Sequence, residues 1–353
     1  DAGAAGDEQV DPYQGQYSGR LYGQRENVQT RQGKDGFETG GIYRSDDRGL
    51  TWKRVNSLTD RPFYFSVIAV APQDPETIWS CGIPVFKSTD GGKRFRQVQR
   101  QIHVDYHALW IDPRDVDHVL VAGDGGLHQT HDGGRTWEQI DNLPIGQFYH
   151  VDTDTSDPYR IYGGLQDNGT WGGPSRSRWS EGTGIDEWVT IAGGDGFGAA
   201  VDQTDPNIVI CTSQNGALLR VNMARGSAGG VDKPGDAGEW NWDTPFFLSP
   251  HNQKILYLAG RKAVRSLDQG RNSQTISPVL PLTEKGTATA IAESPRVAGL
   301  LYAGTDDGAL WRSKDGGVNW TKVPGQPAGL IPCSGSIDGS NAYFSFNNGL
   351  GPN

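Results

Sequence analysis

The stretch THDGGRTW, residues 130–137, carries an aspartate, two glycines and an aromatic residue, and similar stretches recur along the chain. They are SDDRGLTW at 45–52, STDGGKRF at 88–95 and SKDGGVNW at 313–320, with a worn copy, SLDQGRNS, at 266–273. Neighbouring copies start 43, 42 and 47 residues apart, and the gap from 130 to 266 has room for two diverged copies. We place these near Gly163 (GGLQDNGTW) and Ser213 (SQNGALLRVN). A fixed period of this length is typical of repeat architectures.

A second pattern precedes each copy, as in ALWIDPRDVDHVLVAG and AAVDQTDPNIVICTS. An alternating apolar strand ends at an Asp-Pro or similar turn, and a second apolar strand follows. The repeated stretch then joins a third strand to a fourth. Four antiparallel strands in each period of about 40–45 residues predict the blade of a β-propeller.

The blade count predicts an all-β, seven-bladed β-propeller of four-stranded antiparallel blades. Residues 40–55 and 328–347 supply too few strands for a blade each, so we expect both ends of the chain to share one blade. Such a blade would close the ring and remove exposed sheet edges. Residues 1–39 are then an irregular segment, and residues 40–350 form a single propeller domain. Residues 221–242 are interpreted as a Gly-rich insertion, either a flap or a disordered loop.

The repeated stretch is interpreted as a structural turn. We expect Asp132 to accept hydrogen bonds from the amides of its own turn, as short aspartate side chains do. Gly133 and Gly134 allow the positive φ that a tight hairpin needs, and Trp137 is expected to bury its ring between strands. A catalytic residue would not be needed in every copy. The equivalent structural aspartates are Asp47, Asp90, Asp268 and Asp315.

Composition limits the functional classes. The formal net charge of −10 argues against nucleic acid or an anionic membrane as the main partner. No apolar run approaches the length of a membrane span. The start, DAGAAGDEQVDPYQGQ, fits either a mature N-terminus after cleavage or a cut within a longer chain. Three cysteines allow at most one disulfide, for which Cys81 and Cys333 are the better pair because they fall on adjacent predicted blades.

Strand direction predicts where a ligand would bind. The segment leading into each first strand and the loop after each second strand lie at one end of the blade, and the repeated turn lies at the other. In IHVDYHALW, residues His103, Asp105 and His107 alternate and are predicted to share a strand face. Two interpretations stay open: the three residues hold a divalent metal, the one candidate cofactor, or they line a solvated channel.

Further polar residues are predicted at the same end. Carboxylates, amides and rings gathered at one channel mouth suit a sugar ligand, and two of the acids could serve as general acid and base. Asp-Gly and Asn-Gly are also favoured hairpin turns, so a structural role stays open, above all for Asp124 and Asp307. Asp167 and Asp195 are favoured for function because LQDNGTWGG and AGGDGFG break the repeat. The candidate ligand-binding residues are His103, His107, Asp124, Gln166, Asn168, Trp171, Gln214, Asn215 and Asp306.

The pattern Ser-x-Asp-x-Gly-x-Thr-Trp resembles the Asp-box, or BNR repeat, of sialidases, tandem-propeller xyloglucan hydrolases, sortilin-like receptors and a photosystem II assembly factor. The run from HALWIDPRDVDHVLVAG through GGLQDNGTWGGPS to SQNGALLR resembles secreted bacterial BNR-repeat glycosyl-hydrolase-like or sortilin-N-terminal-like proteins. The resemblance covers most of residues 40–347 and implies the propeller fold and a secreted location. The Arg-Ile-Pro motif of sialidases is missing, and a single propeller would form only half of a xyloglucanase cleft.

Together these observations favour a secreted propeller that binds a glycan or a protein, as a scaffold or as part of a larger chain or complex. The alternative is a glycoside hydrolase that uses a pair among Asp105, Asp167 and Asp195.

Overall fold

The computed structural model describes residues 41–56, 58, 67–98, 103–141, 146–180, 182–324, 331–338 and 341–347. The chain divides into two compact units, Asp1–Leu143 (unit 1) and Pro144–Asn353 (unit 2), and each is described by itself. The irregular segment predicted for residues 1–39 lies outside the described residues. The single domain predicted for 40–350 stays a prediction.

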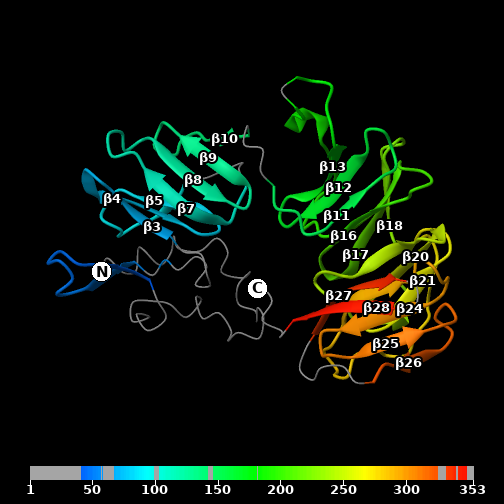
Figure 1. Ribbon diagram of the computed structural model, residues 1–353. Helices are drawn as coiled ribbons and strands as arrows, with labels where there is room; N and C mark the ends of the chain where they lie inside the picture. The colour runs from blue at the N-terminus through cyan, green and yellow to red at the C-terminus, as the bar shows by residue number, and fades with distance from the viewer. Residues whose placement is uncertain are drawn as a thin grey trace. The chain divides into compact units, whose positions relative to one another are not determined.

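Unit 1 contains two four-stranded antiparallel sheets and a two-stranded sheet within its described residues (Figure 1). The two-stranded sheet pairs β1 (Ile42–Arg44) with β2 (Lys53–Asn56). The four-stranded sheets run β3 (Val67–Ala71), β4 (Asp74–Cys81), β5 (Val85–Ser88), β6 (Arg96–Gln97), and β7 (Tyr106–Ile111), β8 (Val119–Gly123), β9 (Gly126–Thr130), β10 (Glu138–Ile140).

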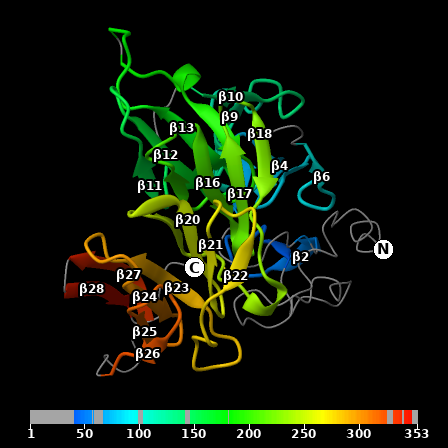
Figure 2. The same cartoon turned by 90° about the vertical axis from the view of Figure 1, so that its right-hand side faces the viewer.

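Unit 2 contains four such four-stranded sheets and a two-stranded sheet, again counting described residues (Figure 2). The sheets are β11 (Val151–Thr153), β12 (Arg160–Leu165), β13 (Gly169–Pro174), β14 (Val189–Ala192); β15 (Ala199–Val201), β16 (Ile208–Ser213), β17 (Ala217–Asn222), β18 (Ser227–Gly230); β19 (Phe246–Ser249), β20 (Asn252–Ala259), β21 (Ala263–Ser266), β22 (Ser273–Thr275); β23 (Ala288–Glu293), β24 (Leu301–Thr305), β25 (Leu310–Ser313), β26 (Trp320–Lys322); and β27 (Ile331–Asp338), β28 (Asn341–Asn347). Three short 3-10 helices are η3 (Ile185–Glu187), η4 (Gln214–Gly216) and η5 (Gly235–Ala237).

This architecture confirms the predicted all-β class and the four-stranded antiparallel repeat, in which consecutive strands pair in chain order as in a propeller blade. The terminal strands predicted to share a blade are present as β1–β2 and β27–β28, one two-stranded sheet in each unit. Closure of a seven-bladed ring stays a prediction.

Each sheet packs its apolar face on the next sheet of its unit. In unit 1, Trp79 and Val85 of the first sheet bury against Tyr106 and Val121 of the second. In unit 2, Ile210 and Leu218 share a core with Leu256 and other residues of the following sheet. The period-2 alternation of strands explains this, because it places one apolar row on each side of a twisted sheet.

The repeated turn lies between the third and fourth strands. In the β9–β10 turn, one Asp132 oxygen accepts the backbone N–H groups of Arg135 and Thr136, each at 2.9 Å, and the Thr130 hydroxyl also donates to it at 2.9 Å. The second oxygen accepts the Thr136 hydroxyl at 2.8 Å. These hydrogen bonds hold the pKa of Asp132 well below its ordinary value. Gly133 and Gly134 have φ of 67° and 89°.

The other copies repeat this arrangement. Asp47, Asp90, Asp268 and Asp315 each accept a serine hydroxyl two residues earlier and a backbone N–H four residues later. The Trp137 ring is half-buried and packs edge-on against Trp79, with ring centroids 6.4 Å apart. In contrast, Trp52 of the first copy stays 61% exposed.

The predicted diverged copies near Gly163 and Ser213 are wrong. GGLQDNGTW and SQNGALLRVN lie at the β12–β13 and β16–β17 connections, between second and third strands. The third-to-fourth connections of these two sheets are residues 175–188 and 223–226, which lack the Asp-Gly-Gly stretch. The sheets are regular members of the series, but their turns have been replaced.

The interpretation of residues 221–242 as an insertion also needs correction. This segment contains the end of β17, all of β18 and η5, and β18 pairs with β17 from Leu219↔Gly230 to Asn222↔Ser227. It therefore completes a regular four-stranded sheet. β18 could not be predicted from the sequence, because SAGG has none of the β-branched or aromatic residues that favour strands.

Candidate functional site

Strand direction separates two ends in every four-stranded sheet. The repeated turns and the connections between first and second strands lie at one end. At the other end, here called the loop end, lie the connections between second and third strands and the segments that lead into the first strands. In unit 2 these lead-in segments are residues 146–150, 193–198, 240–245 and 281–287. The candidate ligand-binding residues belong to such loop-end segments, except His107 and Trp171, which lie within β7 and β13.

In unit 1, the loop between β8 and β9 is closely packed on the segment before β7. The backbone N–H of Asp124 donates to the Asp105 carbonyl at 3.1 Å, and a Cβ added at Gly123 would lie 2.2 Å from that carbonyl oxygen. A Cβ added at Gly125 would lie 2.0 Å from the His103 Cβ. Only glycine fits these two positions, so this loop is fixed against His103 and Asp105.

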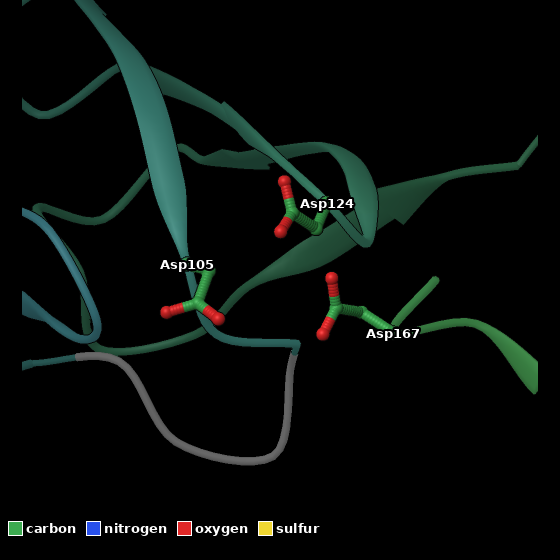
Figure 3. Close-up of side chains that lie close together, drawn as sticks. All are labelled: Asp105, Asp124 and Asp167. Atoms are coloured by element: carbon green, nitrogen blue, oxygen red, sulfur yellow. The ribbon is translucent and has the colours of Figure 1, made fainter. Parts of the chain in front are cut away.

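The strand face predicted to be shared by His103, Asp105 and His107 does not form, and the metal site considered for these residues stays a prediction. Only His107 lies in β7, and Asp105 precedes the strand with a φ of +63°, which interrupts the alternation of side chains. The structure instead pairs His107 with Asp124, Nε2 to Oδ1 at 2.7 Å. Carboxylate oxygens of Asp105 and Asp124 lie within 4.8 Å of each other (Figure 3).

In unit 2, the two aspartates favoured for function lie together. Asp167 is in the β12–β13 loop and Asp195 is in the segment leading into β15. The backbone N–H of Asp167 donates to Asp195 Oδ1 at 3.0 Å. Asp167 has a φ of +64°, a left-handed conformation that aspartate tolerates better than most residues. The break in the repeat is therefore a contact between loops of two neighbouring sheets.

Glycines allow these two loops to meet backbone to backbone. The Gly196 N–H donates to the Leu165 carbonyl at 3.0 Å, and the Gly169 N–H donates to the Gly194 carbonyl at 2.9 Å. A Cβ added at Gly196 would lie 2.1 Å from the Gly169 carbonyl oxygen. The glycines of LQDNG and GGDGFG are thus required by close packing, and they fix the Asp167–Asp195 contact.

Burial sets the electrostatics of this contact. Asp195 is only 8% exposed. Its pKa is raised above the ordinary value first by burial and then by the hydrogen bond and negative charge of the Asp167 side chain, against the backbone N–H of Asp167, which lowers it. Two carboxyl groups this close disfavour double ionisation, which raises the pKa of Asp195 in the same direction as burial does.

Aromatic residues flank the carboxyl pair. Phe197, two residues after Asp195, is fully buried, and its ring meets the edges of Tyr149 and Trp242 at centroid distances of 5.0 and 5.8 Å. Tyr149 and Trp242 are themselves 46% and 37% exposed. The Tyr149 hydroxyl donates to Gln166 Oε1 at 2.6 Å. This site therefore presents two partly exposed rings beside amide and carboxyl groups.

Polar contacts join the lead-in segments around the loop end of unit 2. His150 Nε2 lies 2.8 Å from Asp243 Oδ2, and this carboxylate raises the pKa of His150. Asn241 Nδ2 donates to the Thr287 hydroxyl at 2.9 Å. Thr287 in turn donates its N–H and hydroxyl to the two oxygens of Asp306, at 2.8 and 3.0 Å. Segments before β11, β19 and β23 are thus linked by side chains.

The remaining predicted residues have mainly local partners. Asn168 donates to the Gln166 carbonyl, and the Trp171 indole donates to the Asn168 carbonyl at 2.6 Å. Gln214 accepts the Ser213 hydroxyl, and Asn215 lies in η4 with a φ of 55°. Asp307 accepts two backbone N–H groups and two hydroxyls from residues 282, 283 and 305. Only the Thr305 contact lies within the loop of Asp307 itself, and the other three come from the segment that leads into β23, so the turn interpretation of Asp307 stays a prediction.

Sequence reasoning missed Tyr149, His150, Trp242, Asp243 and Thr287. Trp242 is partly exposed at the loop end. A positional signal was available, since these residues, like Asp195, immediately precede the first strand of a sheet. Their chemistry gave no signal, because none of them breaks a repeated motif.

Comparisons with known proteins point to polysaccharide-active relatives. No protein-family model matches the chain. A xyloglucanase from a Paenibacillus species is 46% identical over 55 residues, which is 15% of this chain and 5% of that protein. Xyloglucanase Xgh74A from Acetivibrio thermocellus is 25% identical over 288 residues, which is 67% of this chain and 32% of that protein. The chain thus spans a third or less of the length of these curated relatives.

Among solved structures, that of YCF48 bound to D1 peptide matches with a TM-score of 0.37 and 14% identity, covering 82% of this chain and 92% of that chain. Within the described residues of our structure, no helix is long and apolar enough to cross a membrane. Cys81 and Cys211 are buried, and the side chain of Cys333 lies outside the described ones, so the predicted Cys81–Cys333 pair stays a prediction.

Proposed function

We propose that the loop end of unit 2 binds a β-linked glucan chain of the xyloglucan class, and that the chain acts as a glycan-binding module. The observation that carries this proposal is the site around Phe197, where Tyr149 and Trp242 expose ring surface beside the Asp167–Asp195 pair. Sugar rings stack on aromatic faces while planar amides and carboxyl groups bind their hydroxyls. The names of the curated relatives support the choice of glycan.

Hydrolysis by Asp167 and Asp195 is the second candidate. Glycosidases hold their two carboxyl groups roughly 5–10 Å apart, so that a sugar or a water fits between them. Here Asp195 accepts the backbone N–H of Asp167 and shares a side-chain hydrogen bond with it. A carboxyl pair in direct contact suits recognition of hydroxyl groups better than attack from opposite faces of a sugar. We therefore place binding ahead of hydrolysis.

Calorimetric titration with xyloglucan oligosaccharides, combined with an assay for new reducing ends, separates the two candidates. Binding without product supports the binding module. Product formation that disappears in the double variant Asp167→Asn, Asp195→Asn would establish the hydrolase. The variant Trp52→Ala is the matched control, because it removes a 61% exposed tryptophan from a repeated turn in unit 1. No binding to xyloglucan, cello-oligosaccharides or mannan would refute the glycan proposal and favour a protein ligand.

The finer features of the fold belong to the same proposal. The turns at Asp47, Asp90, Asp132, Asp268 and Asp315 are proposed to be Asp-boxes of a seven-bladed ring closed by β1–β2 and β27–β28. A secreted or periplasmic location follows from the proposed polysaccharide ligand. His107 and Asp124 of unit 1 are proposed to contribute a second polar contact region, with structural turn chemistry as the alternative for Asp124.

A further inference from the structure

The proposed glycan site of unit 2 is built from segments that lead into three consecutive sheets. Phe197, before β15, is buried, and its ring meets the rings of Tyr149, before β11, and Trp242, before β19. β15 contacts both β11 and β19. The two partly exposed rings therefore come from the outer two of the three segments, and their spacing depends on how these outer segments are held relative to each other.

A side-chain hydrogen bond joins the two outer segments directly. His150 Nε2 lies 2.8 Å from Asp243 Oδ2, and the two side chains are 58% and 34% exposed. His150 immediately follows Tyr149, and Asp243 immediately follows Trp242. The bond therefore ties together the two stretches of main chain that carry the rings.

Backbone hydrogen bonds hold each outer segment to a nearby element. The Tyr149 N–H donates to the Gly164 carbonyl of β12 at 2.9 Å. The Trp242 carbonyl accepts the Asn215 N–H of η4 at 3.2 Å. These two bonds give each ring-bearing residue its own support, whereas the bond between the imidazole and the carboxylate sets one segment against the other.

Protonation of His150 controls the strength of this bond. Asp243 raises the pKa of His150 through the hydrogen bond and through its negative charge, against burial, which lowers it. A charged imidazolium donates a stronger hydrogen bond to a carboxylate than a neutral imidazole does. Because the pKa is raised, the charge-assisted bond is complete below the ordinary histidine pKa and is lost as the pH rises through the folded pKa. The link is therefore strong in mild acid and weak in alkali.

Other carboxyl groups lie on the elements around this pair. Asp152 in β11 accepts the Val201 N–H at 2.9 Å, and Asp195 accepts the Asp167 N–H at 3.0 Å. Burial raises the pKa of both Asp152 and Asp195. Substitutions at position 150 leave these groups in place, so a change of pH dependence in such variants reports on His150.

We propose that the His150–Asp243 pair positions Tyr149 and Trp242 for the glycan, and that glycan affinity therefore falls as the pH rises from mildly acid to alkaline. This inference rests on the proposed function of the loop end. Both members of the pair are positioning residues, because they act through the spacing of the two rings. A neutral glucan has no group that titrates in this range, so the pH dependence belongs to the protein.

Calorimetric titration with xyloglucan oligosaccharides, between about pH 5.5 and 9, tests the proposal. We expect the affinity of the wild type to fall about three- to fivefold across this range, the scale of one partly exposed ion pair. His150→Gln keeps an N–H donor without a charge, so its affinity should be low at every pH. His150→Arg is charged at every pH used, so its affinity should stay near the value of the wild type in acid.

His251→Gln is the matched control. His251 belongs to the same unit and lies in the β19–β20 turn, with Nε2 2.7 Å from the Ser294 carbonyl oxygen, so this variant should keep the pH profile of the wild type. All affinities are compared below the unfolding midpoint of each protein. A wild-type affinity that does not change with pH, or a His150→Gln profile as steep as that of the wild type, overturns the positioning role and leaves glycan binding standing. No binding by any of these proteins at any pH refutes the proposed function itself and this inference with it.

Discussion

Asp132 and Asp195 both stand beside glycines in loops between strands, yet their environments are opposite. Asp132 accepts four hydrogen bonds within its own eight-residue turn, and these lower its pKa. Asp195 is buried and accepts a backbone N–H from the loop of a neighbouring sheet, and its pKa is raised. The hydrogen bonds of Asp132 come from its own turn, and this turn recurs along the chain. Asp195 is held in an unfavourable environment by contacts that occur in one place.

This difference shows how to separate structural from functional aspartates in a repeat protein. A carboxylate whose acceptors are filled by its own turn stabilises the fold and has little capacity left for a ligand. A carboxyl group whose pKa is raised by burial and by a neighbouring carboxyl group is costly for the fold. Such a group is more often retained for function. The predictions below test this contrast.

The largest expected effect is on the packing between the Asp167 and Asp195 loops. Gly196→Ala places a Cβ about where the Gly169 carbonyl lies, so we expect a loss of about 3 kcal/mol in unfolding free energy. Glycan affinity should fall below detection because the carboxyl pair separates. Denaturant unfolding and calorimetric titration measure the two effects. Gly193→Ala in the same segment is the control, since its Cβ would meet nothing within 4 Å.

The next effect concerns the exposed ring at the loop end. Trp242→Ala should weaken glycan binding about tenfold, the cost of losing one stacking surface of about 1.4 kcal/mol. The unfolding midpoint should also fall, because the residue is only 37% exposed and its ring packs on Phe197, so affinity is measured below that midpoint. If Trp242→Ala binds the glycan with the same affinity as the wild type, the ligand does not contact the site around Phe197.

A smaller effect is expected in the repeated turn. Asp132→Ala removes the acceptor of the Arg135 and Thr136 amides, so the unfolding midpoint should fall by a few degrees. Calorimetric titration below that midpoint should give wild-type affinity. Loss of binding by a folded Asp132→Ala protein would show that the turn contributes to ligand binding. The distinction between Asp132 and Asp195 would then be wrong.

The smallest effect is the pH dependence of stability, in which the two aspartates have opposite signs. The raised pKa of Asp195 means that the native state holds its proton more tightly, so this contribution is present at acid pH and is lost as pH rises through the folded pKa. The lowered pKa of Asp132 contributes stability at pH values above its ordinary pKa. This contribution is lost as the pH falls through the folded pKa. Denaturant unfolding at a series of pH values measures both contributions. Asp195→Asn should reduce the loss of stability with rising pH, and Asp132→Asn should reduce the loss of stability with falling pH.

Much of the fold could be predicted because it rests on local chemistry. The repeated turn, its glycines and the strand order follow from residues within one period. The loop end could be predicted only in part, since its contacts cross sheets: His150 and Asp243, for example, are 93 residues apart. Asp167 and Asp195 were found because they break the repeat. Tyr149 and Trp242 do not interrupt the sequence repeat, and only their packing on Phe197 in the structure identifies them as part of the site.

The most direct test of the central claim is to remove one charge from each type of loop without changing its shape. Xyloglucan oligosaccharide affinity should be measured by calorimetric titration for Asp167→Asn and Asp132→Asn. Asparagine keeps the left-handed backbone at position 167 and nearly the same volume at both positions. We predict that Asp167→Asn loses about tenfold in affinity, while Asp132→Asn binds like the wild type despite a lower unfolding midpoint. Equal affinities for the two variants, or loss in Asp132→Asn alone, would contradict the account.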